Sequence, residues 1–456
     1  MVSYIHLANR FRWVYCQLET LRHCLPASVR RTLDELPESL DATYKRVLRE
    51  IKKPNRDHAL RLLQCLVVAI RPLRVEELAE VLAIDFEHAG GMAKLNSSWR
   101  WEDQEQALLS SCSSLVSIVW DSDKDDRDHD SRVVQFSHFS VKEFLTSPRL
   151  ATPNRDVSYY RISLEPAHTI MAQACLGVLL QSDDRLEHTG AGNKSLLVGY
   201  AAKYWVRHAQ FKNVSSNVRQ MMESLFDEDK SYFAAWLKLH DMDSEPYPNS
   251  TFYMFASDPG TPAGPLYYAA LCGFQDIVQH LVVKNPLQVN ANGGHYVTPA
   301  IAALAGKHFQ LARLLHRHGS SVDPRGHYRR TPLHSAAYNG HGEMMQVLLE
   351  YQADVNARNY AGNTPLQDAV ISGRHEVIQL LFEYGANPNI TNNRGITPLH
   401  VASMKGNTKA VHLLLEHGVD VDAVDESGRT VLQLALAHGH DEIATLLSAH
   451  GTDSSS

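Results

Sequence analysis

The sequence predicts a mostly α-helical protein in which a C-terminal solenoid of stacked helical repeats follows a helical region with a winged-helix arrangement. Three observations predict this class. One tetrapeptide recurs at a step of 33 residues through the C-terminal part, the earlier part has helical apolar spacing without a short repeat, and one short section of it changes to strand-like runs. Because 456 residues are too many for one ordinary core, several structural units are expected.

The composition is that of a soluble globular protein, with 44% hydrophobic residues, 21% charged residues and a net charge of -7. This charge gives no bias toward phosphate-rich partners, so no nucleic acid is expected. The six cysteines are scattered without a Cys-x-x-Cys pair, which favours reduced thiols in the cytoplasm or the nucleus. No apolar stretch has the length of a membrane span or the position of a signal peptide, so no membrane partner is expected.

The repeated motif is a Thr-Pro-Leu-His-like tetrapeptide. It begins at Thr331, Thr364, Thr397 and Thr430, and further steps back reach Thr298 and Gly264. Six units are therefore in register between residues 264 and 456.

The motif has the chemistry of a helix start. Each threonine is expected to cap a helix by accepting from its first free amides, with proline at the first helical position, where a missing N–H costs nothing. Glycine ends the short helix in four units, at Gly340, Gly373, Gly406 and Gly439. A second helix with apolar residues at helical spacing follows in each unit, and a polar loop closes it.

This period and signature resemble the ankyrin repeat, with departures in the first two units. The resemblance implies a protein partner on the concave surface and the loop tips, because stacked repeats align their variable positions into an extended surface. The residues expected to bind it are loop-tip and first-helix positions that the repeat does not fix: Tyr328, Arg329, Tyr338, Asn339, Tyr360, Asn363, Ile371, Asn393, Arg394, Met404, Lys405 and Arg429. Repeat-spaced histidines do not converge, so no metal and no cofactor is expected.

The first half has a different pattern. Helices are expected from Leu40 through Tyr44 to Ile51, over residues 56–70, through Val75, Leu78, Leu82 and Ile84, and near residues 104–114. Residues 115–120 and 133–136 read as two strands, which together with the helices indicate a winged helix. A further helical segment is expected from Glu165 to about Leu239, with its aromatic residues in a helix-on-helix core.

Three stretches resemble the region that follows the nucleotide-binding module in fungal NACHT-type proteins: Phe11–Leu18, Leu36–Tyr44 and Phe136–Leu145. The resemblance implies a winged helix similar to that found with GPI-inositol deacylases. The expected organisation is a helical segment like the end of a NACHT module at 1–55, a winged-helix-like domain at 56–150, a helical region at 151–245, a junction at 246–263 and six ankyrin repeats at 264–456.

Two sites that this family could suggest are not expected. The segment Gly190–Ser195 lacks the spacing of a phosphate-binding loop and the glycine before lysine, so it is interpreted as a loop between helices. The loop between the two strands is rich in aspartate from Asp121 to Asp130, and the helix at residues 104–115 has no Lys or Arg. Both features oppose DNA binding.

The leading functional hypothesis is a non-enzymatic intracellular scaffold or adaptor. An alternative is a truncated fungal NLR-like signalling or incompatibility receptor without its own ATPase site, or a regulator that associates with a complete NACHT-type NTPase in trans; an incomplete gene model would also explain the missing module. An enzyme and a DNA-binding regulator are the remaining alternatives, and no assembled catalytic motif calls for the former.

Overall fold

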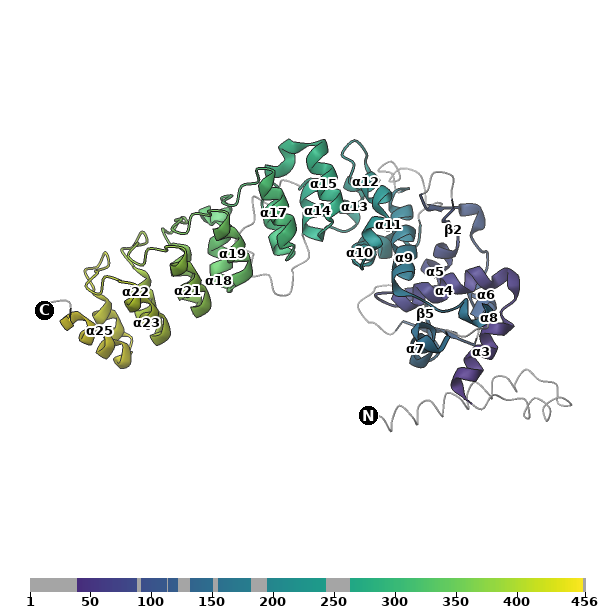
Figure 1. The fold of residues 1–456 in the computed structure, drawn as a ribbon, viewed down its shortest axis with the longest axis horizontal. Helices are drawn as coiled ribbons and strands as arrows, with labels where there is room; N and C mark the ends of the chain where they lie inside the picture. The colour runs from purple at the N-terminus through teal and green to yellow at the C-terminus, as the bar shows by residue number, and fades with distance from the viewer. Residues whose placement is uncertain are drawn as a thin grey trace. The chain divides into compact units, whose positions relative to one another are not determined.

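The computed structural model describes residues 39–87, 92–112, 114–121, 132–150, 155–181, 195–242 and 263–453. The chain divides into two compact units, Met1–Met242 and Asp243–Ser456. Helices dominate both units, and two small sheets lie in the described part of the first (Figure 1). The predicted fold class is confirmed.

The first unit contains the helices and strands expected for a winged helix. Its elements are α3 (Leu40–Glu50), η2 (Lys53–Asn55), α4 (Arg56–Val68), β1 (Leu73–Arg74), α5 (Val75–Leu82), β2 (Ile84–Asp85), β3 (Lys94–Leu95), η3 (Ser97–Trp99), α6 (Gln104–Cys112), β4 (Val116–Trp120) and β5 (Arg132–Phe136). An antiparallel sheet forms in the order β1-β5-β4, with Leu73 opposite Val134 and Ile118 opposite the same residue on its other side. Strand β1 was not predicted, because two residues are too few to show a period.

One predicted helix extends too far. Ile84 was expected on the helix of Val75, Leu78 and Leu82, but α5 ends at Leu82 and Ile84 pairs with Leu95 in a second small sheet. Its side chain is fully buried there, so its apolar character reflects a core position and not helical spacing. The helix predicted to start at Leu40 is confirmed, with the Ser39 hydroxyl accepting from the Ala42 N–H at 3.2 Å.

The remaining described elements of the first unit are helical, and those from Arg155 onward lie in the predicted helical region. They comprise α7 (Phe139–Thr146), η4 (Pro148–Leu150), α8 (Arg155–Ser158), α9 (Leu164–Leu179), α10 (Val198–Ala209), α11 (Val214–Asn217), α12 (Arg219–Leu225) and α13 (Tyr232–Leu239). The fully buried Trp205 ring lies 5.4 Å from that of Trp236, and the Trp236 indole N–H donates to the Ala202 carbonyl at 3.0 Å. The predicted aromatic core between helices is confirmed.

The second unit is a row of helix pairs with loops projecting along one edge (Figure 1). Six pairs lie within the described residues: α14 (Pro265–Cys272) with α15 (Gln275–Lys284), α16 (Pro299–Ala305) with α17 (Phe309–Arg317), α18 (Pro332–Asn339) with α19 (Gly342–Glu350), α20 (Pro365–Ser372) with α21 (His375–Glu383), α22 (Pro398–Lys405) with α23 (Thr408–Glu416), and α24 (Val431–Ala437) with α25 (Asp441–Asp453). Short turns η7 (Pro286–Asn290) and η8 (His327–Arg329) lie between pairs.

The predicted threonine caps are confirmed at Thr364, Thr397 and Thr430, each of which accepts from the third helical N–H while that residue's side chain accepts from the threonine N–H. At Thr298 the prediction is wrong, since its buried hydroxyl has no partner. The third helical residue there is Ile301, which has no polar group to return.

Candidate functional site

The loops between repeats turn back on themselves as short hairpins, here named tip 3 (residues 324–331), tip 4 (357–364), tip 5 (390–397) and tip 6 (423–430). In tip 4 the Asn359 N–H donates to the Asn363 carbonyl at 3.0 Å, and the Asn359 side-chain oxygen accepts from the N–H groups of Ala361 and Asn363. Asn392 and Asp425 do the same in tips 5 and 6. One polar side chain at the first turn position therefore holds the hairpins of tips 4, 5 and 6.

Neighbouring tips are joined through their backbones. The N–H of Tyr360 donates to the carbonyl of Tyr328 at 2.8 Å, that of Asn393 to Ala361 at 3.0 Å, and that of Glu426 to Arg394 at 3.2 Å. Each bond connects one tip to the next, so the four tips form a continuous edge. Side chains on this edge are held in fixed spacing from repeat to repeat.

Tip 3 departs from the other tips in its backbone. Gly326 occupies the position of Asn359, so the stabilising side chain is missing, and Tyr328 and Arg329 both have φ of 57°. Arg329 stands where tips 4, 5 and 6 have Gly362, Gly395 and Gly428. An L-residue in this left-handed region is strained by about 1–2 kcal/mol.

Arg329→Gly should therefore raise the free energy of unfolding by about 0.5–1 kcal/mol, because glycine removes the strain and adds back part of the cost as chain entropy. Urea unfolding followed by far-UV circular dichroism measures it. The matched control is Arg394→Gly, at a tip position that has no positive φ, where a loss of similar size is expected. A loss with Arg329→Gly would contradict the strain.

The residues predicted to bind a partner lie in two rows along the repeats. Exposed members are Tyr328, Arg329, Tyr360, Asn393, Arg394, Lys405 and Arg429, whereas Tyr338, Asn339, Asn363, Ile371 and Met404 are half-buried. Tyr338, Ile371 and Met404 occupy equivalent positions near the ends of α18, α20 and α22. The structure thus arranges these side chains in series, one per repeat, and does not gather them around one point.

Tip and helix rows meet at Tyr338, whose ring lies 5.8 Å from the guanidinium carbon of Arg330 in tip 3. Three other predicted residues are engaged within the fold. The Asn363 side-chain oxygen accepts from Asn392, the Asn393 amide donates to the Tyr360 carbonyl at 2.9 Å, and the Arg429 guanidinium pairs with Asp425 at 2.8 Å. These contacts within the fold are enough to explain why Asn363, Asn393 and Arg429 occupy their positions, so none of the three requires a binding partner.

The prediction omitted two exposed tip arginines, Arg325 and Arg358. They are equivalent positions, and Arg325 donates to the Arg358 carbonyl at 3.2 Å. An alignment of the tips would have found them. The equivalent residues of tips 5 and 6 are Thr391 and Val424, so this position varies between repeats and is not fixed by the repeat.

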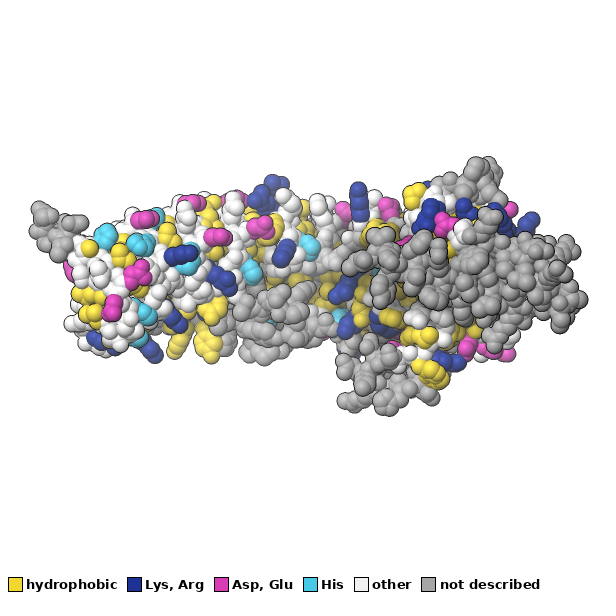
Figure 2. All heavy atoms as spheres, turned by 90° about the horizontal axis from the view of Figure 1, so that it is seen from below, with side chains coloured by type: hydrophobic (Ala, Val, Ile, Leu, Met, Phe, Trp, Pro, Cys, Tyr) yellow, Lys and Arg dark blue, Asp and Glu magenta, His cyan; other side chains and the backbone are white. Residues whose placement is uncertain are grey.

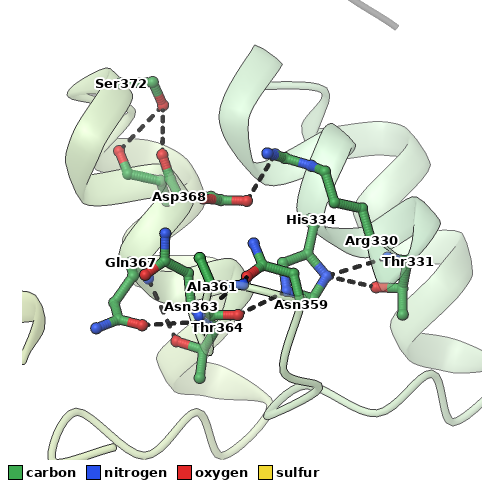
Figure 3. A network of polar contacts seen from close by, with 11 residues as sticks. Arg330, Thr331, His334, Asn359, Ala361, Asn363, Thr364, Gln367, Asp368 and Ser372 are labelled. Atoms are coloured by element: carbon green, nitrogen blue, oxygen red, sulfur yellow. Dashed lines mark hydrogen bonds and ion pairs between the residues drawn. The ribbon is translucent and has the colours of Figure 1, made fainter. Parts of the chain in front are cut away.

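Behind the tips lies a buried polar network that links neighbouring repeats (Figure 3). The Nδ1 atom of His334 accepts from the Thr331 N–H at 3.2 Å, and Nε2 lies 2.9 Å from the carbonyl of Asn363 in the next repeat. This arrangement requires the proton on Nε2. Burial lowers the pKa of His334 to about 4, so the ring is neutral at neutral pH.

The same network contains an ion pair that the sequence did not reveal. Arg330, with 11% of its side chain exposed, donates to Asp368 of α20, with 3% exposed, at 2.6 Å (Figure 3). Burial raises the pKa of the Asp368 carboxyl, and the Arg330 guanidinium opposes that rise. The equivalent residues of the following repeats are Asn363 with Val401 and Ile396 with Leu434, so the charged pair is particular to this junction.

The sequence candidates of the first unit have structural explanations where they are described. Gly190 to Lys194 and residues 122–131 of the aspartate-rich loop lie outside the described residues, as do Phe11–Leu18 and residues 246–262 of the junction predicted at 246–263. Ser195 donates to the buried carboxylate of Glu80, which also accepts from the Leu197 N–H at 2.9 Å. The Glu80 carboxylate therefore holds the start of α10, and Ser195 is one of its two donors.

A buried histidine, His208, contacts the half-buried His168 nearby. His208 of α10 has no exposed surface and lies 3.0 Å from both His168 Nδ1 and the Tyr200 hydroxyl. Burial lowers the pKa of His208 to about 3. Among the described residues, no cluster of three His, Cys, Asp or Glu side chains could hold a metal ion, and none of the helices described is long and apolar enough to cross a membrane.

Comparison with known proteins identifies both parts of the chain. Ankyrin repeats match in three copies, over residues 266–359, 300–392 and 366–456, and the winged helix domain of GPI inositol-deacylase matches residues 46–154. The azaphilone pigments biosynthesis cluster protein L of Monascus ruber is 28% identical over 299 residues, which cover 63% of this chain. The chain spans 61% of that relative's length. It therefore carries ankyrin repeats that follow a winged helix domain of the GPI inositol-deacylase type.

Proposed function

We propose that the chain is a non-enzymatic scaffold or adaptor, located in the cytoplasm or the nucleus, that holds a protein partner on the tips and first helices of its ankyrin repeats. The main observation behind this proposal is the row of backbone hydrogen bonds from Tyr328 to Glu426, which presents variable side chains on a continuous edge. Such preorganised side chains bind a partner without a large ordering cost. Ankyrin repeats generally mediate protein–protein interaction.

Buried thiols among the described residues support the proposal that the chain is not an enzyme. Cys65, Cys112 and Cys272 are buried, and burial raises the pKa of each to about 12. Since the thiolate is the nucleophile, these groups are inert at neutral pH.

Affinity purification with mass spectrometry tests the proposal on the full chain. The variant Tyr338→Ala/Ile371→Ala/Met404→Ala removes the first-helix row and should lower partner recovery at least tenfold, since interface energy concentrates in such side chains. The matched control Gln346→Ala/Gln379→Ala/His412→Ala changes one exposed residue in each of α19, α21 and α23 and should leave recovery unchanged. Circular dichroism verifies that both variants fold.

A third variant tests whether the partner binds to the first unit instead of the repeats. Trp99, Trp101 and Trp120 are 50%, 45% and 64% exposed on the first unit. Recovery that persists in the first-helix variant and is lost in Trp99→Ala/Trp101→Ala/Trp120→Ala would place the binding surface on the winged helix unit and contradict the proposal.

A second candidate function is a truncated or regulatory relative of fungal NLR-like receptors. It is favoured by the combination of the matched winged helix domain with ankyrin repeats. In this case the chain would associate with a complete NACHT-type NTPase. Recovery of such an NTPase with the wild-type chain supports this candidate, whereas recovery of unrelated partners alone opposes it.

A further inference from the structure

Three successive tips carry exposed arginine and tyrosine side chains side by side. We name this set the Arg–Tyr strip: Arg325, Tyr328 and Arg329 of tip 3, Arg358 and Tyr360 of tip 4, and Arg394 of tip 5. All six are exposed, with Tyr328 at 64% and Tyr360 at 71%. Tyrosine and arginine are enriched among the residues that dominate binding energy at interfaces.

The charge of the strip has one sign. Residues 324–331, 357–364 and 390–397 contain no Asp and no Glu. Within the described residues none of the four arginines of the strip is in an ion pair, whereas the neighbouring Arg330 and Arg429 are paired with Asp368 and Asp425. The strip ends at tip 6, which carries Asp425 and Glu426.

At tip 3 a carboxylate borders the strip. Asp323 precedes tip 3 and is close enough to Arg325 for its pKa to be lowered by that charge, although burial raises it more. One of its oxygens accepts from the Asp354 N–H at 2.8 Å. Asp323 therefore serves the backbone of the next loop. Arg325 donates to the Arg358 carbonyl, and Arg358 donates to the Gly362 carbonyl and the Asn393 side chain, so Arg329 and Arg394 are the guanidinium groups that meet an incoming acceptor.

The spacing of the tips fixes the length of the ligand. Packed helices lie about 8–10 Å apart, so the three tips span roughly 20 Å. An extended peptide covers this distance in about six residues at about 3.3 Å each. The guanidinium group binds carboxylates with two parallel hydrogen bonds, and the tyrosine rings offer apolar contact between them.

We infer that the Arg–Tyr strip binds an extended acidic segment of a partner protein, about six residues long, through carboxylates on Arg329 and Arg394 and apolar side chains on its tyrosines. The inference rests on the proposed function, whose partner class it names. The strained backbone at Arg329 accords with it, since strain of this kind is retained where a side chain has a task.

Charge beyond the strip argues for a peptide over a nucleic acid. A nucleic acid needs basic residues along its whole path, but this strip stops at the acidic tip 6 and the chain has a net charge of -7. On the face shown in Figure 2, basic, acidic and uncharged side chains are interspersed over the repeats.

Fluorescence anisotropy with the full chain tests the inference. The probe is a labelled eight-residue peptide of glutamate pairs separated by single leucines, and its counterpart has glutamine in place of every glutamate. We expect the acidic peptide to bind at least tenfold more tightly than the glutamine peptide. Arg329→Gly/Arg394→Gln should weaken it at least tenfold, because each arginine loses a charge-assisted hydrogen bond.

The control variant Arg317→Gln/Lys409→Gln removes the same charge from exposed positions on α17 and α23 and should change the affinity less than twofold. Equal binding by wild type and the strip variant overturns the inference, as does tighter binding of an RNA octamer than of the acidic peptide. Thermal unfolding of the strip variant separates lost binding from lost fold, since Arg329→Gly relieves strain.

The same strip variant in the affinity purification distinguishes the two proposals. Partner recovery that the first-helix variant loses and the strip variant retains leaves the scaffold function standing and overturns the acidic-segment inference. Recovery unaffected by either variant overturns the scaffold function itself.

Discussion

Asp368→Leu should lower the free energy of unfolding of the ankyrin unit by about 3–5 kcal/mol. Arg330 keeps its charge at all accessible pH values, and with 11% of its side chain exposed it cannot recover full hydration. Removing one partner of a buried ion pair leaves an uncompensated charge, which is the main source of a cost of this size.

The reciprocal variant is expected to be milder and to depend on pH. In Arg330→Ile the buried Asp368 can take up a proton, because burial already raises the pKa of this carboxyl. The cost should therefore be about 1–3 kcal/mol near pH 5 and should increase toward pH 8, where ionisation of the buried group is enforced.

The double variant distinguishes the cost of leaving one charge unpaired from the cost of changing the two side chains. Arg330→Ile/Asp368→Leu reproduces Ile396 and Leu434, which occupy the same two positions further along the stack. Its stability should return to within about 1–2 kcal/mol of wild type, since apolar residues of suitable size often replace a buried pair without loss. Costs of the single variants that simply add would contradict a coupled pair.

The chain supplies an internal control for this measurement. All six tryptophans are at positions up to Trp236, so tryptophan fluorescence follows the first unit and leaves the repeats silent. Urea unfolding followed by far-UV circular dichroism should show the shifted transition of the repeats. The fluorescence transition should be unchanged in all three variants.

The repeats could be predicted because their determinants are local. A threonine before proline and a polar residue two positions after that proline define the caps at Thr364 and Thr397 within one helical turn, and the step of 33 residues shows which positions stack. The prediction was wrong at Thr298, where Ile301 replaces the polar residue that would complete the cap.

Other features depend on contacts between distant segments. Strand β1 is two residues long and exists because Leu73 meets Val134 of β5, 61 positions later, so its own sequence carries no period. Arg330 and Asp368 belong to different repeats, and each alone looks like an ordinary variable position. The binding residues remain a prediction, and the structure adds Arg325 and Arg358 to the exposed tip residues that the sequence selected.

His334→Gln should leave stability at pH 7 nearly unchanged and remove part of its loss in acid. Repeat 4 already carries this substitution. The Gln367 side chain accepts from the Thr364 N–H at 2.9 Å and donates to the Ile396 carbonyl at 2.6 Å, the same two roles that His334 has with Thr331 and Asn363. We expect a change of less than about 1 kcal/mol at pH 7.

The acid effect follows from the lowered pKa. Burial lowers the pKa of His334 to about 4, and Arg330 and Arg325 add to this, whereas an unfolded histidine has a pKa of about 6.5. As pH falls below about 6.5 the unfolded chain takes up the proton first, so stability present above that pH is lost progressively down to about pH 4. A difference of about 2.5 pKa units corresponds to roughly 3 kcal/mol.

Urea unfolding at pH 7, 5.5 and 4.5, followed by circular dichroism, measures this loss in wild type and His334→Gln. The loss should be smaller in the variant by about 2 kcal/mol at pH 4.5, and not abolished, because burial also lowers the pKa of His400. The exposed His412 on α23 supplies the control, since His412→Gln should leave the pH profile of wild type intact. If His334→Gln and wild type lose the same stability in acid, the buried neutral ring of His334 is not what makes the repeats sensitive to acid.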